Sequence, residues 1–304
     1  MSGSEQAELL GGGGGFLYTP TISANTNNYN MKSAAIAAGW DQVAPLVMTV
    51  TVNSGVVIGS TSTGSYAFDT GNTFPSGSRL KLVNAGKIVG KGGGGGDGSD
   101  AMYRAFVGDP GWGSNSSDGY SGTAGGPALN AQVALEIDNT GGVIGGGGGG
   151  GGGGAVSFSF TDDGCFDRLD SDGGGGGAGQ GSTSSSGGRS TALMYQDSNE
   201  CNTYTVAQYL AAGGASSDAS AGAGGARGIW TGAANPCAAS AIGGNGGALG
   251  SAGSAGESIT SYVSVSCTNP EFHSGGGGGA AGACTQGNAN ITWTATGTRY
   301  GALN

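Results

Sequence analysis

The stretch Asn139-Thr-Gly-Gly-Val-Ile-Gly145 runs on through Gly154, so ten consecutive glycines follow directly on a short apolar strand pattern. Glycine makes up 72 of the 304 residues. Collagen needs glycine at every third position and abundant proline, and the chain holds only 7 prolines. Flexible Gly/Ser linkers lack aromatic residues, whereas 4 Trp, 10 Tyr and 8 Phe recur between these runs. The composition therefore favours glycine runs packed against one another in an ordered lattice.

Ten glycine-rich runs can be traced along the chain. A glycine run can adopt the polyglycine II helix, which has three residues per turn, rises about 3.1 Å per residue and makes no internal hydrogen bonds. Its backbone groups must then bond to neighbouring runs, and only glycine allows the close approach that this needs. We expect the unbroken run 145–154 at the centre and runs interrupted by larger residues, such as Gly243–Gly250, at the rim. The runs are 92–98, 121–127, 145–154, 173–179, 181–189, 211–216, 221–228, 242–249, 251–256 and 275–282.

The lengths of the connecting segments predict how the runs alternate. Short joins near Gln180, Ser217–Ser220 and Gly250 alternate with long inserts. If the first run leaves a base, all the long inserts fall together at the far end and the chain terminus returns to the base. Loops on a rigid scaffold are where binding function usually lies. The five expected distal loops are 99–120, 155–172, 190–210, 229–241 and 257–274.

An internal repeat precedes the lattice. Asn53-Ser-Gly55-Val-Val-Ile-Gly59 is echoed from Asn84 to Gly90 and from Asn139 to Gly145, each time behind an apolar strand. The Asn-x-Gly corner supplies the positive-φ residue that turns one strand into the next. Three such units predict three faces of a small β-helical prism, or else an antiparallel sheet with similar turns.

Two further elements are expected in the base. The alanine-rich segment Asn25–Trp40 predicts a short helix, capped by Asn28 or Asn30 and ended by Gly39. Asn290–Thr296 reads as a strand near the chain end. The predicted fold class is therefore mainly β and irregular, with a prism-like base and a sandwich of about ten polyglycine II helices.

Charge is unevenly distributed over this chain, whose net charge is −10. Residues 97–274 hold 16 acidic and 4 basic residues, net −12, and the remainder holds 4 acidic and 6 basic residues, net +2. An acidic outer part argues against nucleic acid, and it disfavours phosphate-rich lipopolysaccharide. No apolar stretch approaches 18 residues and no signal-peptide pattern is present, so we expect no membrane insertion. These features fit a virion component assembled in the host cytoplasm and released by lysis.

The inserts hold the side chains with which a lattice could recognise a partner. A glycine lattice offers no apolar pocket, so aromatic residues in the inserts must form small local cores or stay exposed as binding anchors. The residues predicted to bind a receptor are Tyr103, Phe106, Trp112, Tyr120, Phe166, Tyr195, Tyr204, Trp230, Tyr262 and Phe272.

Cysteines follow the same division of the chain. Four of the five inserts carry one each, namely Cys165, Cys201, Cys237 and Cys267, and Cys284 lies near the base. Because the loops have little core, we expect two inter-loop disulfides among the four, in any of three pairings, with Cys284 free. Metal binding by these residues is disfavoured because no C-x₂-C pair exists.

Signals for enzyme chemistry are weak, and we expect no catalysis, cofactor or metal. The single histidine, His273, could belong to a catalytic triad but lies in an insert beside Phe272. Asp69-Thr70-Gly71 resembles an aspartic protease signature, yet the second copy that such a dyad needs is missing, so it reads as a turn. The five aspartates within Thr161–Asp172 could bind Ca²⁺, but no EF-hand spacing is present and a solvated loop is favoured.

The segment from Asn28 to Gly154 resembles the adhesin that caps the long tail fibre of T-even-like phages. The resemblance is carried by Leu82-Val-Asn-Ala-Gly-Lys-Ile-Val-Gly-Lys-Gly and Ile137-Asp-Asn-Thr-Gly-Gly-Val-Ile-Gly-Gly-Gly, which look like that family's strand-to-polyglycine junctions. It implies a non-enzymatic virion protein at the tail fibre tip, with a β-helical attachment domain, a polyglycine II sandwich and variable loops that bind outer-membrane proteins.

On this reading, residues 1–24 are a lead-in and 25–91 form the attachment domain, completed by 128–144 and 288–304. Residues 92–287 form the polyglycine II domain. The expected partners are a bacterial outer-membrane receptor and a trimeric tail fibre protein at the base, with a single chain capping the trimer or, alternatively, a homotrimer. A purely structural fibre or decoration protein and an ice-binding lattice remain alternatives.

Overall fold

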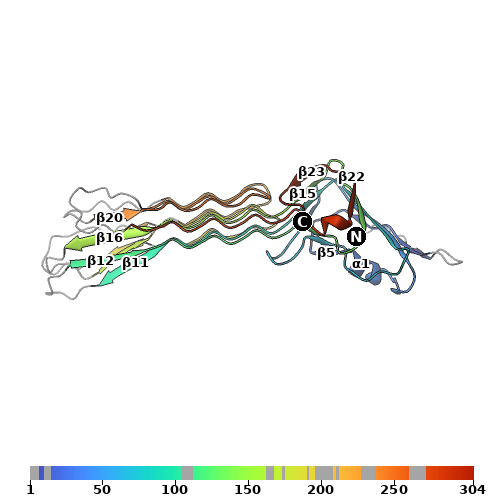
Figure 1. Cartoon of the computed structure of the whole chain (residues 1–304), viewed down its shortest axis with the longest axis horizontal. Helices are drawn as coiled ribbons and strands as arrows, with labels where there is room; N and C mark the ends of the chain where they lie inside the picture. The colour runs from blue at the N-terminus through green and yellow to red at the C-terminus, as the bar shows by residue number, and fades with distance from the viewer. Residues whose placement is uncertain are drawn as a thin grey trace.

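The computed structural model describes residues 7–9, 15–104, 112–161, 168–172, 175–189, 192–195, 208–209, 212–226, 237–259 and 272–304. The molecule is elongated, with sheets at one end, glycine runs side by side in the middle, and further strands at the far end (Figure 1). Helical structure in the described residues is confined to α1 (Met31–Ala37) and the 3₁₀ turn η1 (Asn288–Asn290). The expected mainly β and irregular chain is confirmed. No helix in the described ranges has the length and apolar character needed to cross a bilayer.

Three sheets form the base of the molecule, and all their strand pairs are parallel except β1–β2. Sheet A contains β1 (Ala7–Leu9), β2 (Phe16–Tyr18), β3 (Thr21–Ile22), β6 (Leu46–Val52), β9 (Arg79–Asn84), β14 (Leu135–Asp138) and β22 (Ile291–Ala295). Sheet B contains β4 (Thr26–Asn27), β7 (Val57–Gly59), β10 (Lys87–Val89), β15 (Val143–Gly145) and β23 (Thr298–Tyr300). Sheet C contains β5 (Tyr29–Asn30), β8 (Phe68–Asp69), β13 (Leu129–Asn130) and β21 (Thr285–Gln286).

The chain visits these sheets in a fixed order, A to B to C, and then returns to A one strand further along. It passes through β3–β4–β5, β6–β7–β8, β9–β10–β13 and β14–β15–β21, and ends on β22–β23. Two of the B-to-C connections are very long, residues 90–128 and 146–284, and these contain the ten glycine runs except for Gly145, which ends β15. The lattice is therefore an insertion at one corner of the base, in two neighbouring turns of the chain.

The three Asn-x-Gly repeats occupy one corner of the base in successive turns. Each links a strand of sheet A to a strand of sheet B, and their second strands pair in register, Val57 with Lys87 and Lys87 with Val143. The expectation that they form three different faces is wrong, because parallel pairing stacks equivalent segments on top of one another. The buried Asn84 donates from Nδ2 to Oδ1 of Asn139 at 2.7 Å, which ties two of these turns together.

The base has an apolar core that follows from strand alternation. Along β6 every second residue is buried, from Leu46 to Val52. Met31 and Ala35 of α1 pack into the same core, so the helix covers an end of the strand stack. Asn30 caps the helix by accepting a hydrogen bond from the Ser33 amide at 2.8 Å.

Two boundaries in the base differ from the sequence expectation. The helix is shorter than Asn25–Trp40, because 26–27 and 29–30 are strands that pair with β7 and β8. Within the expected lead-in 1–24, β2 and β3 pair with β6. The strand conformation of these residues is fixed by parallel pairing with strands far away in the sequence, and local sequence patterns do not predict such pairing.

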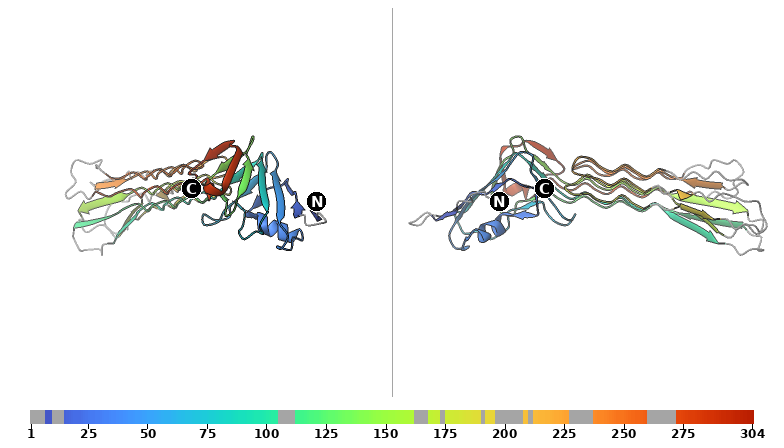
Figure 2. Two further views of the ribbon diagram at one scale, coloured as in Figure 1. Left: turned by 45° about the vertical axis from the view of Figure 1, so that its right-hand side comes forward. Right: turned by 180° about the vertical axis from the view of Figure 1, so that it is seen from behind.

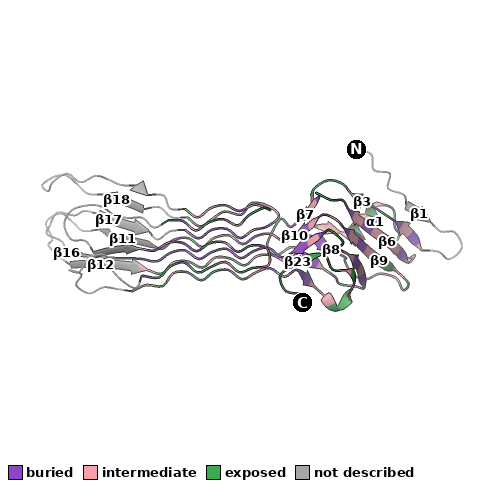
Figure 3. Cartoon of the chain, turned by 90° about the horizontal axis from the view of Figure 1, so that it is seen from above, coloured by how far each residue is buried: buried purple, intermediate pink, exposed green. Residues whose placement is uncertain are grey.

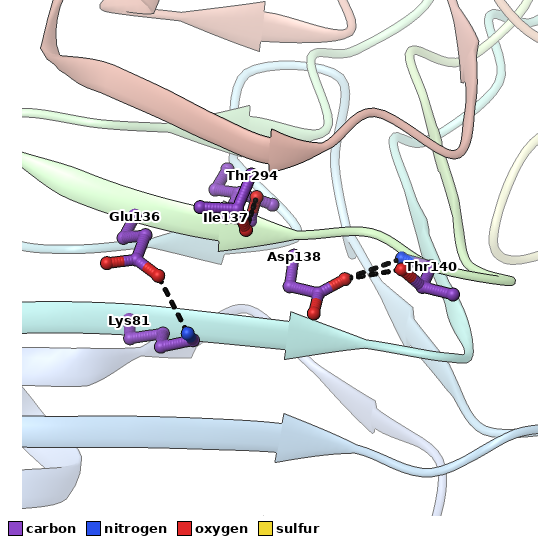
Figure 4. A network of polar contacts seen from close by, with 6 residues as sticks. All are labelled: Lys81, Glu136, Ile137, Asp138, Thr140 and Thr294. Atoms are coloured by element: carbon purple, nitrogen blue, oxygen red, sulfur yellow. Dashed lines mark hydrogen bonds and ion pairs between the residues drawn. The ribbon is translucent and has the colours of Figure 1, made fainter.

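The solvent side of sheet A carries a line of polar contacts (Figure 4). Lys81 of β9 and Glu136 of β14 form an ion pair of 2.7 Å, and the Asp138 carboxylate accepts from the amide and hydroxyl of Thr140 at 3.0 and 2.7 Å. The Thr140 hydrogen bonds lower the pKa of Asp138. The contacts fix the register of β9 against β14 and hold the third Asn-x-Gly turn.

The run 145–154 lies at the centre of the lattice and is buried throughout. Its amides donate in turn to three neighbouring runs, so that every third amide bonds to the same neighbour. Gly147, Gly150 and Gly153 donate to the carbonyls of Gly126, Thr123 and Tyr120 at 2.8–2.9 Å. Its carbonyls accept from three others in the same period of three. The six neighbours are 92–98, 121–127, 175–180, 242–249, 251–256 and 275–282. The prediction of a central position for this unbroken run is confirmed.

Hydrogen bonds among the described parts of the ten runs define three rows. The outer rows are 121–127, 92–98, 181–189 and 251–256, 242–249, 221–226; the middle row is 275–282, 145–154, 175–180, 212–216. The views in Figures 2 and 3 show these runs extending side by side from the base. Gly243–Gly250 lies in an outer row as expected, with Asn245 and Ala248 exposed.

The run 175–180 is also interior, although it contains Ala178, which is fully buried. The expectation that runs with larger residues lie at the rim is wrong here. A side chain at Gly222 or Gly246 would collide with the Ala178 backbone, so these two neighbours must be glycine for the runs to lie this close.

Candidate functional site

The far end of the lattice is built from two small sheets. One has the order β12 (Trp112–Ser117), β16 (Val156–Thr161) and β20 (Cys237–Ser240). The other has the order β11 (Asp100–Arg104), β17 (Arg168–Asp172), β18 (Ala192–Tyr195) and β19 (Gln208–Tyr209). All these pairs are antiparallel, and both sheets lie at the end away from the base (Figures 1 and 3). Segments far apart in sequence are thus gathered at one end.

The change from glycine run to strand takes place in a single layer. Ala155, Ala241 and Ile259 form a small buried cluster there. The amide of Ala155 donates to Glu257 and its carbonyl accepts from Ala241, at 3.2 and 3.0 Å. This layer extends the hydrogen bonding of the lattice into the strands, which orders the bases of three inserts.

The ten aromatic residues predicted from sequence divide into three groups. Tyr103, Trp112 and Tyr195 lie in β11, β12 and β18, where Tyr103 pairs with Leu169 and Trp112 with Thr161. Tyr120 and Phe272 are 63% and 61% exposed at the bases of their inserts. The remaining five lie outside the described residues: Phe106, Phe166, Tyr204, Trp230 and Tyr262.

The cysteines follow a similar division. Cys237 lies in β20, and Cys165, Cys201 and Cys267 lie outside the described residues. Cys284 is a free, buried thiol in the base, as expected. Its Sγ donates to the Ile144 carbonyl at 3.2 Å, and burial raises its pKa to about 11. This thiol therefore has little thiolate character near neutral pH.

A polar cluster at the edge of the far end was missed by the sequence reasoning. Oδ1 of Asp118 accepts the Ser274 amide at 2.8 Å and lies 3.1 Å from Nδ1 of His273. The amide of Gly119 donates to the Ser274 carbonyl at 3.0 Å. The hydrogen bonds from Ser274 and then His273 lower the pKa of Asp118. The only sequence signal was that Asp118 and His273 each stand just before a glycine run.

Two groups of residues considered for chemistry lie wholly or partly in the described part of the chain. Asp69 accepts from the Gly71 amide at 2.8 Å, and Gly71 has φ +73°, so the Asp-Thr-Gly segment is a turn as expected. Of the five aspartates considered for Ca²⁺, Asp170 and Asp172 lie in β17, and Asp162, Asp163 and Asp167 fall outside the described residues. Among the described residues no three His, Cys, Asp or Glu side chains gather as a metal site would require.

One known protein family matches nearly the whole chain. Residues 17–304 match the protein family described as phage tail fibre adhesin Gp38. The chain belongs to this family. The adhesin is therefore a component of a bacteriophage tail fibre.

The adhesin is also similar to a protein of known structure. A chain of the crystal structure of the gp37–gp38 adhesin tip complex of the bacteriophage S16 long tail fibre is similar, with 20% identity and a TM-score of 0.47. The similarity covers 94% of the adhesin and 82% of that chain. No curated protein matches the adhesin.

Proposed function

We propose that the adhesin binds a bacterial outer-surface receptor through its distal inserts, and that this receptor is an outer-membrane protein rather than lipopolysaccharide. The observation that carries the proposal is the position of β11, β12, β16, β17, β18, β19 and β20, all at the end farthest from the base. The five inserts at this end hold the aromatic residues predicted to bind a receptor and most of the charge of the outer part. The excess of acidic residues in 97–274 disfavours phosphate-rich lipopolysaccharide.

The scaffold in this proposal is a polyglycine II sandwich. Hydrogen bonding with a period of three, six neighbours around 145–154 and the three rows of runs all support it. Such rods present backbone that is already bonded to neighbours, so little remains with which to discriminate between partners. Recognition then falls to the inserts, whose ordering on stiff rods lowers the entropic cost of binding.

The base is proposed to be a three-sided β-helical prism that attaches the adhesin to a trimeric tail fibre protein. The repeated A-to-B-to-C path of the chain supports this shape, since one copy supplies three sheets around a common core. In this division the attachment domain comprises 25–91, 128–144 and 288–304 together with β2, β3 and β21, and the remaining residues of 92–287 form the polyglycine II domain. Assembly takes place in the host cytoplasm, and the adhesin has no catalytic role.

We also propose that Cys165, Cys201, Cys237 and Cys267 form two disulfides between inserts. Loops with little core gain most from such links, because a cross-link restricts the unfolded chain. Peptide mapping of the adhesin without reductant should recover pairs of insert peptides. Four alkylatable thiols in these inserts would rule the links out.

The function is tested by binding of purified adhesin to host cells. Replacing Tyr120, Phe272, Trp112, Trp230 or Tyr262 by alanine, one at a time, should weaken binding, by about tenfold where the ring is a central anchor. Tyr300→Ala is the matched control, because Tyr300 is also an exposed tyrosine, 45% accessible, but lies in the base.

Exchange of whole inserts with those of a relative of different host range is the second arm of this test. Host range should follow the inserts. Unchanged host range, together with unchanged binding of all five alanine variants, would favour a purely structural fibre protein. Thermal hysteresis of the purified adhesin would favour an ice-binding lattice instead.

A further inference from the structure

The bases of two inserts are joined at one edge of the lattice. The first insert ends at Asp118–Tyr120, where the run 121–127 begins, and the last insert ends at Phe272–Ser274, where the run 275–282 begins. These runs are neighbours, and the Gly122 amide donates to the Gly277 carbonyl at 2.9 Å. Asp118 and His273 are 155 residues apart in sequence, yet their segments lie side by side.

The two bases are joined by hydrogen bonds to the Asp118 side chain, in addition to the backbone hydrogen bonds between the runs. An ionised carboxylate only accepts hydrogen bonds, so Nδ1 of His273 must carry the proton and donate to Oδ1 of Asp118, over 3.1 Å. The same oxygen accepts the Ser274 amide at 2.8 Å. One oxygen of the first insert thus fixes both the backbone and the imidazole ring of the last insert.

Two further acidic residues belong to segments that are hydrogen-bonded to this contact. The side chains of Asp118 and His273 are 66% and 25% exposed. The segments bonded to them bring two more carboxylates: the carbonyl of Asp97 accepts the Tyr120 amide, and Glu257 precedes Ile259, whose amide donates to the His273 carbonyl at 2.9 Å. The Asp97 carboxylate accepts the backbone amide of Arg189 at 2.6 Å. The Glu257 carboxylate likewise accepts a backbone amide, that of Ile242 at 3.4 Å, so both of these carboxylates form hydrogen bonds outside the contact.

We infer that Asp118 and His273 are positioning residues for receptor recognition: their contact sets the relative position of the first and last inserts. The inference rests on the proposed function, in which these inserts bind the receptor. Tyr120 and Phe272, the two exposed aromatic residues described in the outer part, directly flank the contact in sequence. A shift between the two bases would displace both rings at once. Two anchors that are held in register lose less entropy on binding than two that move independently.

The test compares receptor binding with folding. Asp118→Ala and His273→Ala should each weaken binding to host cells by about tenfold, the size expected for loss of one charge-assisted hydrogen bond. The double variant should bind no more weakly than either single variant, because both remove the same contact. Melting temperature should stay near that of the unchanged adhesin, since the lattice and the base are untouched. Asp138→Ala is the matched control: Asp138 also accepts an amide and a side-chain donor, but it does so in the base.

A conservative variant separates positioning from a general structural role. His273→Gln keeps an amide donor for Asp118, so it should restore binding relative to His273→Ala. If Asp118→Ala lowers the melting temperature, Asp118→Asn, which still accepts the Ser274 amide, takes its place in the comparison.

Two results would overturn the inference. Binding equal to the unchanged adhesin in Asp118→Ala and His273→Ala, while insert exchange still changes host range, would show that the inserts bind without this contact. Binding by His273→Gln that is no stronger than binding by His273→Ala would also contradict it. Failure of the proposed function looks different, because insert exchange itself would then leave host range unchanged.

Discussion

Individual glycines differ sharply in how much space their neighbours leave. A Cβ on Gly276 would fall on the carbonyl oxygen of Tyr120, a backbone atom that cannot move without breaking the lattice. A Cβ on the next residue, Gly277, would meet nothing closer than Oγ of Ser121 at 3.5 Å. Because successive residues of a run point in three directions, only those that point at a neighbouring backbone must be glycine.

The adjacent pair provides a matched prediction. Gly276→Ala should lower the free energy of unfolding by about 1–3 kcal/mol or more, as overpacking does when backbone must shift. Gly277→Ala should be neutral or slightly stabilising, since alanine restricts the unfolded chain. Thermal unfolding of the two variants beside the unchanged adhesin checks this. Equal melting temperatures for both would contradict the close packing described for this edge of the lattice.

The asparagines of the three repeats are also unequal. Asn139 is buried; it accepts from Asn84 at 2.7 Å and its Nδ2 donates to the Thr296 carbonyl at 2.9 Å. Asn53 occupies the same place in the first repeat but is exposed. Asn139→Ala should cost about 2–3 kcal/mol, because the buried Asn84 amide and the Thr296 carbonyl both lose a partner.

Asn53→Ala is the control for that substitution, and it should change stability by less than about 1 kcal/mol. Urea unfolding of the two variants measures the difference. A loss of stability in Asn53→Ala as large as that in Asn139→Ala would mean that the turn itself, rather than the buried side-chain bonds, provides the stabilisation.

At the scale of elements, the runs behave as rods whose bonding repeats every three residues. The four rods that join the base are direct extensions of strands: the amide of Gly90, just after β10, donates to Gly145 of β15 at 3.0 Å, and the Ala128 amide, just before β13, donates to Ala283 at 3.0 Å. The parallel register of the base is thereby carried into the lattice. Glycine runs have high conformational entropy when free, so this connection supplies the order that they lack by themselves.

Hydrogen exchange should reveal the difference between inner and outer rods. The amides of Gly147–Gly153 are buried and bonded to three different neighbours, so they open only when the lattice does. They should exchange far more slowly than the exposed Gly277 and Gly278 of the rim. Exchange measured by NMR on the full chain tests this. Similar rates for the two groups would mean that the central rod is no more protected than the rim.

Much of this arrangement could be predicted from sequence, because glycine runs and Asn-x-Gly corners are local signals. The central place of 145–154 followed from its purity. The interior place of the run with Ala178 did not, since it depends on which glycines of other runs lie against it. The stacking of the three repeats at one corner also required knowledge of strand pairing, which is set by residues far apart in sequence.

The candidate site could likewise be predicted from the sequence only in part. Exposed Tyr120 and Phe272 could be expected at the inserts from the lack of a core in the lattice. The contact of Asp118 with His273 could not, because it depends on the runs 121–127 and 275–282 being neighbours. Chain order separates these runs by more than a hundred residues, and only the row arrangement brings them together.

At the scale of the whole molecule, one chain supplies a complete three-sheet base. Each sheet is formed by successive turns of the same chain, and the apolar core inside them includes Met48, Phe68 and Ile144, one from each sheet. The residues of this core are buried within one copy. The first strand of sheet A, β1, turns antiparallel, which ends the parallel stacking at that edge.

This closure predicts that the isolated adhesin is a monomer. A homotrimer would have to bury a further interface, whereas the three sheets already enclose their core within one copy. Light scattering behind size-exclusion chromatography, at several concentrations, should give the mass of one chain throughout. The fibre protein must be absent from this measurement, because a trimeric fibre could bring several components together. A stable trimer of the isolated chain would contradict the monomer.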